Sequence, residues 1–151
     1  MRKTLNHLSF DLNLPSAQTF KRLRNSVDWG QITDCQAQKA LAASLGGICA
    51  INKSGVIAIA RYVGDGTLNI YIQDVIVAEP FRGQDIGKAL LTKLFKHLQA
   101  VYPADCTIGL MAAKEQDGFY AQFGFTARPS DVYGAGMMAP LGKISLDRAK
   151  G

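Results

Sequence analysis

Apolar residues recur at helical spacing most clearly between residues 86 and 101. Four of them follow one another at every fourth position: Ile86, Leu90, Leu94 and Leu98. This period places them on one face of a helix, and most of the lysines between them fall on the opposite face, where exposure to solvent is the expected role. The spacing therefore predicts one long helix that packs through its apolar stripe.

Two shorter helices are predicted in the first third of the chain. Pro15-Ser16 opens the first, which carries apolar residues on one face. Thr33 and Gln36 have the spacing of a capping box, so a second helix should begin there. We expect this helix to run to Leu45, because Gly46 is a typical helix stop.

Runs rich in β-branched and aromatic residues predict strands. The predicted strands are residues 8–14, 48–51, 56–63, 68–77 and 106–112. A short helix is expected after them, up to Phe123, and Phe125 should start a last sheet segment that includes Met137 to Ala139. This order predicts one mixed α/β (α+β) domain over residues 1–151, with about four helices packed on a largely antiparallel sheet.

The composition is that of an ordinary globular domain, with 48% hydrophobic and 19% charged residues. A net charge of +5 weakly favours an anionic ligand. The basic residues are nevertheless scattered and no nucleic-acid-binding motif occurs, so nucleic acid is not an expected partner. The three cysteines show neither disulfide nor zinc spacing, which predicts a reducing cytoplasm. We expect neither a membrane span nor a secretory signal, because the apolar runs are too short.

The segment from Val75 to Lys88 carries the clearest indication of a binding site. A strand ends, a polar turn containing Gly83 follows, and the long helix begins. Backbone N–H groups at such a turn can bind a phosphate or pyrophosphate, and Arg82 and Lys88 would add positive charge. On local pattern alone, a plain strand–helix turn is the alternative. The glycine spacing excludes both a P-loop and a dinucleotide-binding fingerprint.

This turn closely resembles the acetyl-coenzyme A signature of the GNAT N-acetyltransferase superfamily. The signature is Arg or Gln, two residues, Gly, any residue, then Gly or Ala. Here it reads Arg82, Asp85, Gly87, so that Asp85 replaces the first glycine of the family. A carboxylate at this position could cap the helix and would lie near the anionic pyrophosphate.

A second segment, Gly118 to Phe125, is similar to the family's Tyr-x-x-x-Gly-Phe block, with Tyr120 as its tyrosine. The family often has an asparagine seven residues before this tyrosine, where the present chain has Ala113. The stretch that contains Arg128-Pro129 also looks like small-amine members of the superfamily. The two blocks lie in the family's order, and the resemblance covers residues 56–138.

The resemblance implies direct transfer of an acetyl group from acetyl-CoA to a primary amine of a small-molecule acceptor, without a metal. Tyr120 would protonate the departing thiolate. The implied cofactor-binding residues are Val75, Ile76, Val77, Arg82, Gly83, Gln84, Asp85, Ile86, Gly87 and Lys88. Acetylation of a protein N-terminus or lysine, and non-catalytic binding of acyl-CoA, remain alternatives. The resemblance also makes a homodimer plausible.

Asp74 is the second candidate catalytic residue, and the strand pattern itself marks it. Four apolar residues of the same parity are expected on one face by alternation: Leu68, Ile70, Ile72 and Ile76. A carboxylate aimed at that face is costly unless it has a partner, a cavity or a bulge that turns it outward. One role is structural, with Asp74 bonded to the backbone or to Arg61. The other is that of a general base that takes a proton from the amine.

Four aromatic residues could line a pocket, although core packing is their expected role. They are Trp29, Tyr62, Tyr71 and Phe119. The two histidines are isolated and have no metal-ligand partner at useful spacing.

Overall fold

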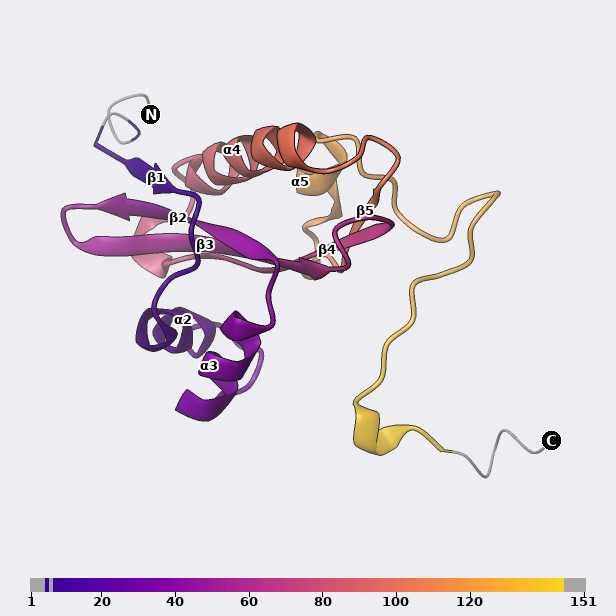
Figure 1. The fold of residues 1–151 in the computed structure, drawn as a ribbon, viewed down its shortest axis with the longest axis horizontal. Helices are drawn as coiled ribbons and strands as arrows, with labels where there is room; N and C mark the ends of the chain where they lie inside the picture. Colours follow the sequence, from indigo (N-terminus) through magenta and orange to yellow (C-terminus); the bar gives the residue numbers. More distant parts are fainter. Residues whose placement is uncertain (1–4, 6, 146–151) are drawn as a thin grey trace. The chain divides into compact units, whose positions relative to one another are not determined.

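A computed structural model describes residue 5 and residues 7–145. The chain divides into two compact units, residues 1–110 and 111–151. The first unit contains a five-stranded sheet in the order β1-β2-β3-β4-β5, antiparallel except for the parallel pair β4–β5 (Figure 1). The strands are β1 (Ser9–Asp11), β2 (Gly46–Asn52), β3 (Gly55–Gly64), β4 (Asn69–Val77) and β5 (Thr107–Leu110).

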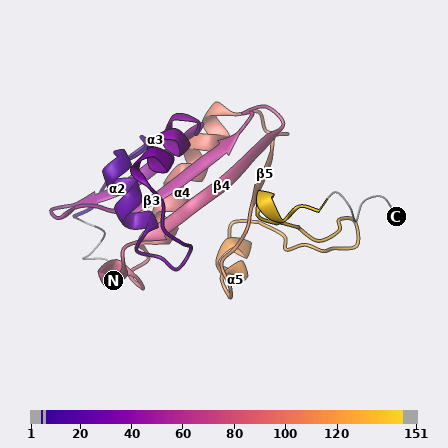
Figure 2. The same ribbon diagram turned by 90° about the horizontal axis from the view of Figure 1, so that it is seen from below.

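Helices cover both faces of this sheet. Helices α2 (Ala17–Arg24) and α3 (Asp34–Ala42) lie on one face, and α4 (Ile86–Val101) lies on the other (Figures 1 and 2). A single 3-10 turn, η1 (Glu79–Phe81), joins β4 to α4. The apolar stripe predicted for α4 is buried as expected, and the bounds of this helix agree with the prediction.

The face covered by α2 and α3 has its own apolar core. Its buried members are Phe20, Leu23, Ala37, Cys49, Ile59 and Ile76. Both helices begin where the sequence indicates, because the Ser16 side chain accepts from the Thr19 N–H and Thr33 and Gln36 form the predicted capping box. The prediction that the second helix reaches Leu45 is wrong, because α3 ends at Ala42 and residues 43–45 connect it to β2.

Strand β4 is shorter at its start than predicted. The carboxylate of Asp65 accepts hydrogen bonds from the N–H groups of Thr67, Leu68 and Asn69 at 2.8–3.0 Å. These bonds close a turn that holds Leu68 outside the strand, where 69% of its surface is exposed. Leu68 is therefore not part of the apolar face to which alternation assigned it.

A bulge divides β4 and overturns the expected single apolar face. Arg61 of β3 lies opposite Gln73 and Ile59 lies opposite Ile76, so the two residues Asp74 and Val75 together oppose Ala60. An extra residue reverses which side chains point to which face. Ile76 consequently packs with Ile59 beneath α2 and α3, whereas Ile70 and Ile72 lie on the α4 face; all three are buried because helices cover both faces.

Strands β4 and β5 pair along only part of their length. The parallel register runs from Asn69 opposite Thr107 to Ile72 opposite Leu110. Residues 73–77 of β4, which include the bulge, extend beyond this pairing. At the carboxyl end of β4, the strand edge on the side of β5 is therefore not paired with β5. We call this edge the open edge.

The second unit contains the helix α5 (Asp117–Ala121) and the 3-10 turn η2 (Leu141–Lys143). The predicted last sheet segment from Phe125 is wrong, because no described residue after Leu110 belongs to a strand. The fifth strand also ends at Leu110 and not at residue 112. Over the described part of the chain, no helix combines the length and the apolar character that crossing a bilayer requires.

Candidate active site

The carboxyl end of β4 presents a backbone donor at its open edge. The Ala78 N–H donates to the Ile57 carbonyl at 2.8 Å, so this N–H points toward β3. Alternate residues of an antiparallel pair exchange such bonds, which directs Ile76 toward β3 and Val77 away from it. The N–H of Val77 thus faces the edge that β5 leaves unpaired, while Ile76 supports the strand from within the sheet.

The turn after β4 is tied back to this strand end. Arg82 donates through Nε to the Val77 carbonyl at 3.0 Å, and the Gln84 amide donates to the Pro80 carbonyl at 3.2 Å. Gly83 and Asp85 both have left-handed backbones, with φ of +72° and +59°. The sequence-predicted residues 75–77 and 82–88 are thereby brought together in one region of the first unit.

Asp85 occupies the N-cap position of α4 but does not cap the helix. Its side chain makes no hydrogen bond to the first turn, so the expected capping role is wrong. The reason is conformational, since a side-chain cap normally requires an extended backbone and Asp85 is left-handed. Glycine enters that conformation without strain, whereas aspartate does so at a cost of about 1 kcal/mol. The backbone thus explains why a glycine suits this position.

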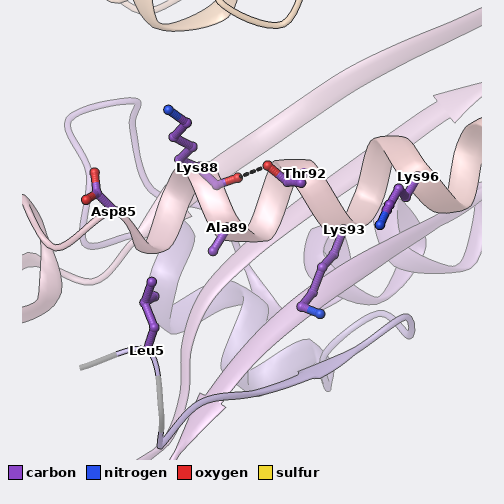
Figure 3. Close-up of a pocket in the computed structure, with 7 residues that line it drawn as sticks. All are labelled: Leu5, Asp85, Lys88, Ala89, Thr92, Lys93 and Lys96. Carbon is purple, nitrogen blue, oxygen red and sulfur yellow. Dashed lines mark hydrogen bonds between the residues drawn. The ribbon is translucent and has the colours of Figure 1, made fainter. Parts of the chain in front are cut away.

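The first turn of α4 offers the features of an anion site. The N–H groups of Ile86, Gly87 and Lys88 have no acceptor within the helix, as at any helix start, and they lie at the positive end of the helix dipole. Lys88 is exposed beside them. A hollow of about 390 Å³ runs along α4 from this point, and Figure 3 shows Asp85 and Lys88 at one end of it. The remaining residues that line it are Leu5, Ala89, Thr92, Lys93 and Lys96.

Asp74 is buried in the bulge and held by two arginines. Arg24 of α2 approaches Oδ1 at 3.0 Å, and Arg61 of β3 approaches Oδ2 through Nε at 2.9 Å and Nη2 at 2.8 Å. Arg61 is the partner that the sequence analysis expects if the role of Asp74 is structural. Neither carboxylate oxygen can take up a proton without weakening an arginine contact, so the geometry favours a structural role. A base role for Asp74 remains a prediction.

Tyr120 lies on α5 in the second unit. It is half-buried among aromatic rings, with centroids 5.1 Å from Phe119 and 6.2 Å from Phe125. This burial raises the pKa of the Tyr120 phenol above its usual value near 10, so the hydroxyl is protonated at neutral pH and can donate. Its role as general acid remains a prediction.

Asp74, Arg24, Arg61 and Ser44 form one cluster of polar side chains, and the sequence analysis does not identify Arg24 or Ser44 as members of it. Arg24 lies in a helix fifty residues before Asp74, and no local spacing links the two. The sequence indicates only that a buried carboxylate needs a cationic partner, and it does not show which of the 17 basic residues that partner is. Ser44, which accepts from Arg61 Nη1 at 3.1 Å, extends the cluster to the segment after α3.

Comparison with known proteins places this geometry in a family. Residues 16–139 match the model of the acetyltransferase (GNAT) domain. The chain belongs to the GNAT acetyltransferase family. The mixed five-stranded sheet with the four α-helices of the described residues is accordingly a GNAT-like fold, as predicted. The family match includes residues 56–138, on which the resemblance rests, and extends toward the N-terminus to residue 16.

Relatives of known sequence are N-acetyltransferases. The GCN5-related N-acetyltransferase 1 (chloroplastic) of Arabidopsis thaliana is 36% identical over 78 residues, which are 52% of this chain and 39% of that protein. The uncharacterised N-acetyltransferase ycf52 of Porphyra purpurea is 30% identical over 118 residues, 76% of this chain and 67% of that protein. The chain thus spans well under half of the first of these relatives.

Solved structures share the fold. A GNAT-family acetyltransferase of Streptococcus pneumoniae superposes with a TM-score of 0.71 at 22% identity, and the match covers 91% of this chain and 99% of that one. At this identity the likeness concerns the fold. Within the described residues, no group of three or more His, Cys, Asp or Glu side chains could hold a metal ion.

Replacing Asp85 should strengthen binding of coenzyme A. Asp85→Asn keeps the side-chain size and the tolerance of the left-handed backbone but removes a negative charge beside the anion site. We expect the dissociation constant of coenzyme A, measured by calorimetry, to fall about fivefold, as expected for about 1 kcal/mol of exposed charge repulsion. Asp131→Asn, in the second unit, is the matched control and should have no effect. Weaker binding in the Asp85 variant would show that the carboxylate helps to hold the ligand.

Proposed function

We propose that this chain is an acetyl-CoA-dependent N-acetyltransferase that acetylates a primary amine of a small molecule. The observation that carries the proposal is the combination of a backbone donor at the open edge, the Val77 N–H, with the N–H groups of the first turn of α4, which follow it after the turn that Arg82 ties back. Family membership and relatives that are named N-acetyltransferases support it. The acceptor and the activity of the whole protein are part of the proposal.

The protein's own groups match the parts of an acyl-CoA. An extended pantetheine arm can lie along an unpaired strand edge as an added strand does, and residues 73–77 supply such an edge. The Val77 N–H would donate to the carbonyl oxygen that gains negative charge during transfer. The N–H groups of residues 86–88, together with Lys88, would hold the pyrophosphate. Acetyl-CoA supplies the activated acetyl group as its thioester.

Two proton transfers accompany the reaction. An alkyl ammonium group has a pKa near 10 and must lose a proton before its nitrogen attacks the thioester. Asp74 would accept that proton directly or through water only by weakening its contacts with the two arginines, and this favours a base other than Asp74. The departing thiolate gains a proton or a hydrogen bond, which the protonated Tyr120 hydroxyl would supply.

The first test of the proposal is binding of free coenzyme A. A ligand that binds only the folded protein raises its melting temperature, so coenzyme A should shift the melting curve upward. Gly87→Glu should abolish that shift, because it places bulk and negative charge against the phosphates. An unchanged shift in a folded Gly87→Glu protein would place the cofactor elsewhere. The protein is also assayed for release of coenzyme A from acetyl-CoA with a panel of amines, N-terminal peptides and lysine peptides. A melting shift with coenzyme A, but no release with any member of the panel, would favour a non-catalytic binding module.

Tyr120→Phe should separate chemistry from binding. The substitution removes one hydroxyl, and a positioned acid typically contributes 10²–10⁴-fold, so we expect turnover to fall about 10²- to 10³-fold. The coenzyme A melting shift should not change. Wild-type turnover should also decline at alkaline pH as the phenol, whose pKa burial raises, loses its proton. Near-wild-type turnover of the folded variant with saturating amine would remove Tyr120 from the mechanism.

A further inference from the structure

The loop between α2 and α3 holds a tryptophan where a core residue was expected. Trp29, the single tryptophan of the chain, has 44% of its surface exposed. Core packing, the expected role, is therefore wrong for this residue. The exposed part of the ring is an apolar aromatic face that does not take part in the core and is available to a ligand.

The loop that carries Trp29 is fixed at several points. The Asn25 side chain bonds in both directions to Ile32, donating to its carbonyl at 3.3 Å and accepting from its N–H at 2.9 Å. The Gln31 side-chain amide donates to the Asn25 carbonyl at 3.2 Å, and the backbone N–H of Trp29 donates to the Val27 carbonyl at 2.9 Å. The exposed ring is thus held on a preorganised loop, and little conformational entropy remains to be lost when a ligand packs against it.

One arginine joins this loop to the bulge in β4. Arg24 contacts Asp74 Oδ1 through Nε at 3.0 Å, and its Nη1 donates to the carbonyls of Trp29 at 3.3 Å and Gly30 at 3.5 Å. Its guanidinium carbon lies 5.2 Å from the centre of the Trp29 ring. Asp74 in turn lies three residues before Val77. The guanidinium of Arg24 therefore lies between the indole and the bulge, and it contacts both of them.

We propose that Trp29 forms a wall of the acceptor site and selects a primary amine attached to one apolar or aromatic body. This inference rests on the proposed function and names the acceptor class for the same site. An indole face attracts apolar and aromatic groups by burial and ring stacking. Arg24 is the positioning residue, because it sets both the loop and the ring.

Charge near the ring discriminates against acceptors with a second cationic group. Arg24 and Arg61 share the single carboxylate of Asp74, so this cluster has one excess positive charge. A diamine that placed its distal ammonium at Trp29 would meet Arg24 on the same ring, where like charges repel. A monoamine with an uncharged body meets no such cost. Polyamines are thus the disfavoured class.

Intrinsic fluorescence tests the inference directly, because the chain contains no other tryptophan. The wild-type protein is saturated with free coenzyme A and titrated with 2-phenylethylamine, while Trp29 emission is recorded. We expect a saturable shift to shorter wavelength as the ring loses water, and no such shift with 1,4-diaminobutane. Emission that does not change while 2-phenylethylamine is acetylated would overturn the proposal. A saturable shift without any acetyl transfer would support the acceptor site and contradict the proposed function.

Variants provide the kinetic arm of the test. Trp29→Ala should raise the KM for 2-phenylethylamine about tenfold, with the KM for acetyl-CoA unchanged, and Trp29→Phe should restore most of the loss. Arg24→Lys keeps the charge but loses the fork that holds the loop, so it should raise the same KM and alter Trp29 emission before any amine is added. Leu68→Ala, at another exposed apolar residue of the first unit, is the matched control and should change neither value. An unchanged amine KM in folded Trp29→Ala would overturn the proposal.

Discussion

The ion pairs of Asp74 with Arg24 and Arg61 fix the bulge in β4, and the bulge sets the course of the strand end that forms the site. A non-glycine residue in a left-handed conformation, with φ of +52°, persists only where its surroundings fix it. Two arginines supply that fixation through the carboxylate of Asp74, and they come from α2 and from β3. Removing either arginine would leave a buried charge short of a partner, which is strongly destabilising. The bulge shifts the register of β4 against β3, and the residues from Gln73 to Val77 lie beyond the part of β4 that pairs with β5.

A second strained residue ends the same segment. Asp85 repeats the left-handed conformation eleven residues later, where it turns the chain into α4. Between the two lie the open edge at Val77 and the turn that Arg82 ties back to it. Both ends of the binding segment are therefore set by aspartates in a conformation that favours glycine, one fixed by ion pairs and the other exposed.

Sequence reasoning predicts the elements of the first unit well and the site only in outline. The stripe of α4 and the capping box at Thr33 are local patterns, so they reveal these helices directly. The bulge is not local, because its cause is a pair of arginines contributed by two other elements. Alternation therefore assigned Ile76 to the wrong face, although it identified Asp74 as the residue that needed a partner. The cap expected from Asp85 failed for a related reason, since the backbone angle of a turn cannot be read from residue type.

Amide hydrogen exchange with and without coenzyme A tests whether the Val77 edge and the start of α4 bind the cofactor, because it reports on each backbone donor. We expect saturating coenzyme A to slow exchange at Val77, whose N–H faces the open edge, and at residues 86–88, whose N–H groups lie at the start of α4. Amides of β1, at the opposite edge of the sheet, should exchange at an unchanged rate. If coenzyme A binds and leaves the amides of Val77 and of residues 86–88 unprotected, the cofactor does not bind at this strand edge and helix start.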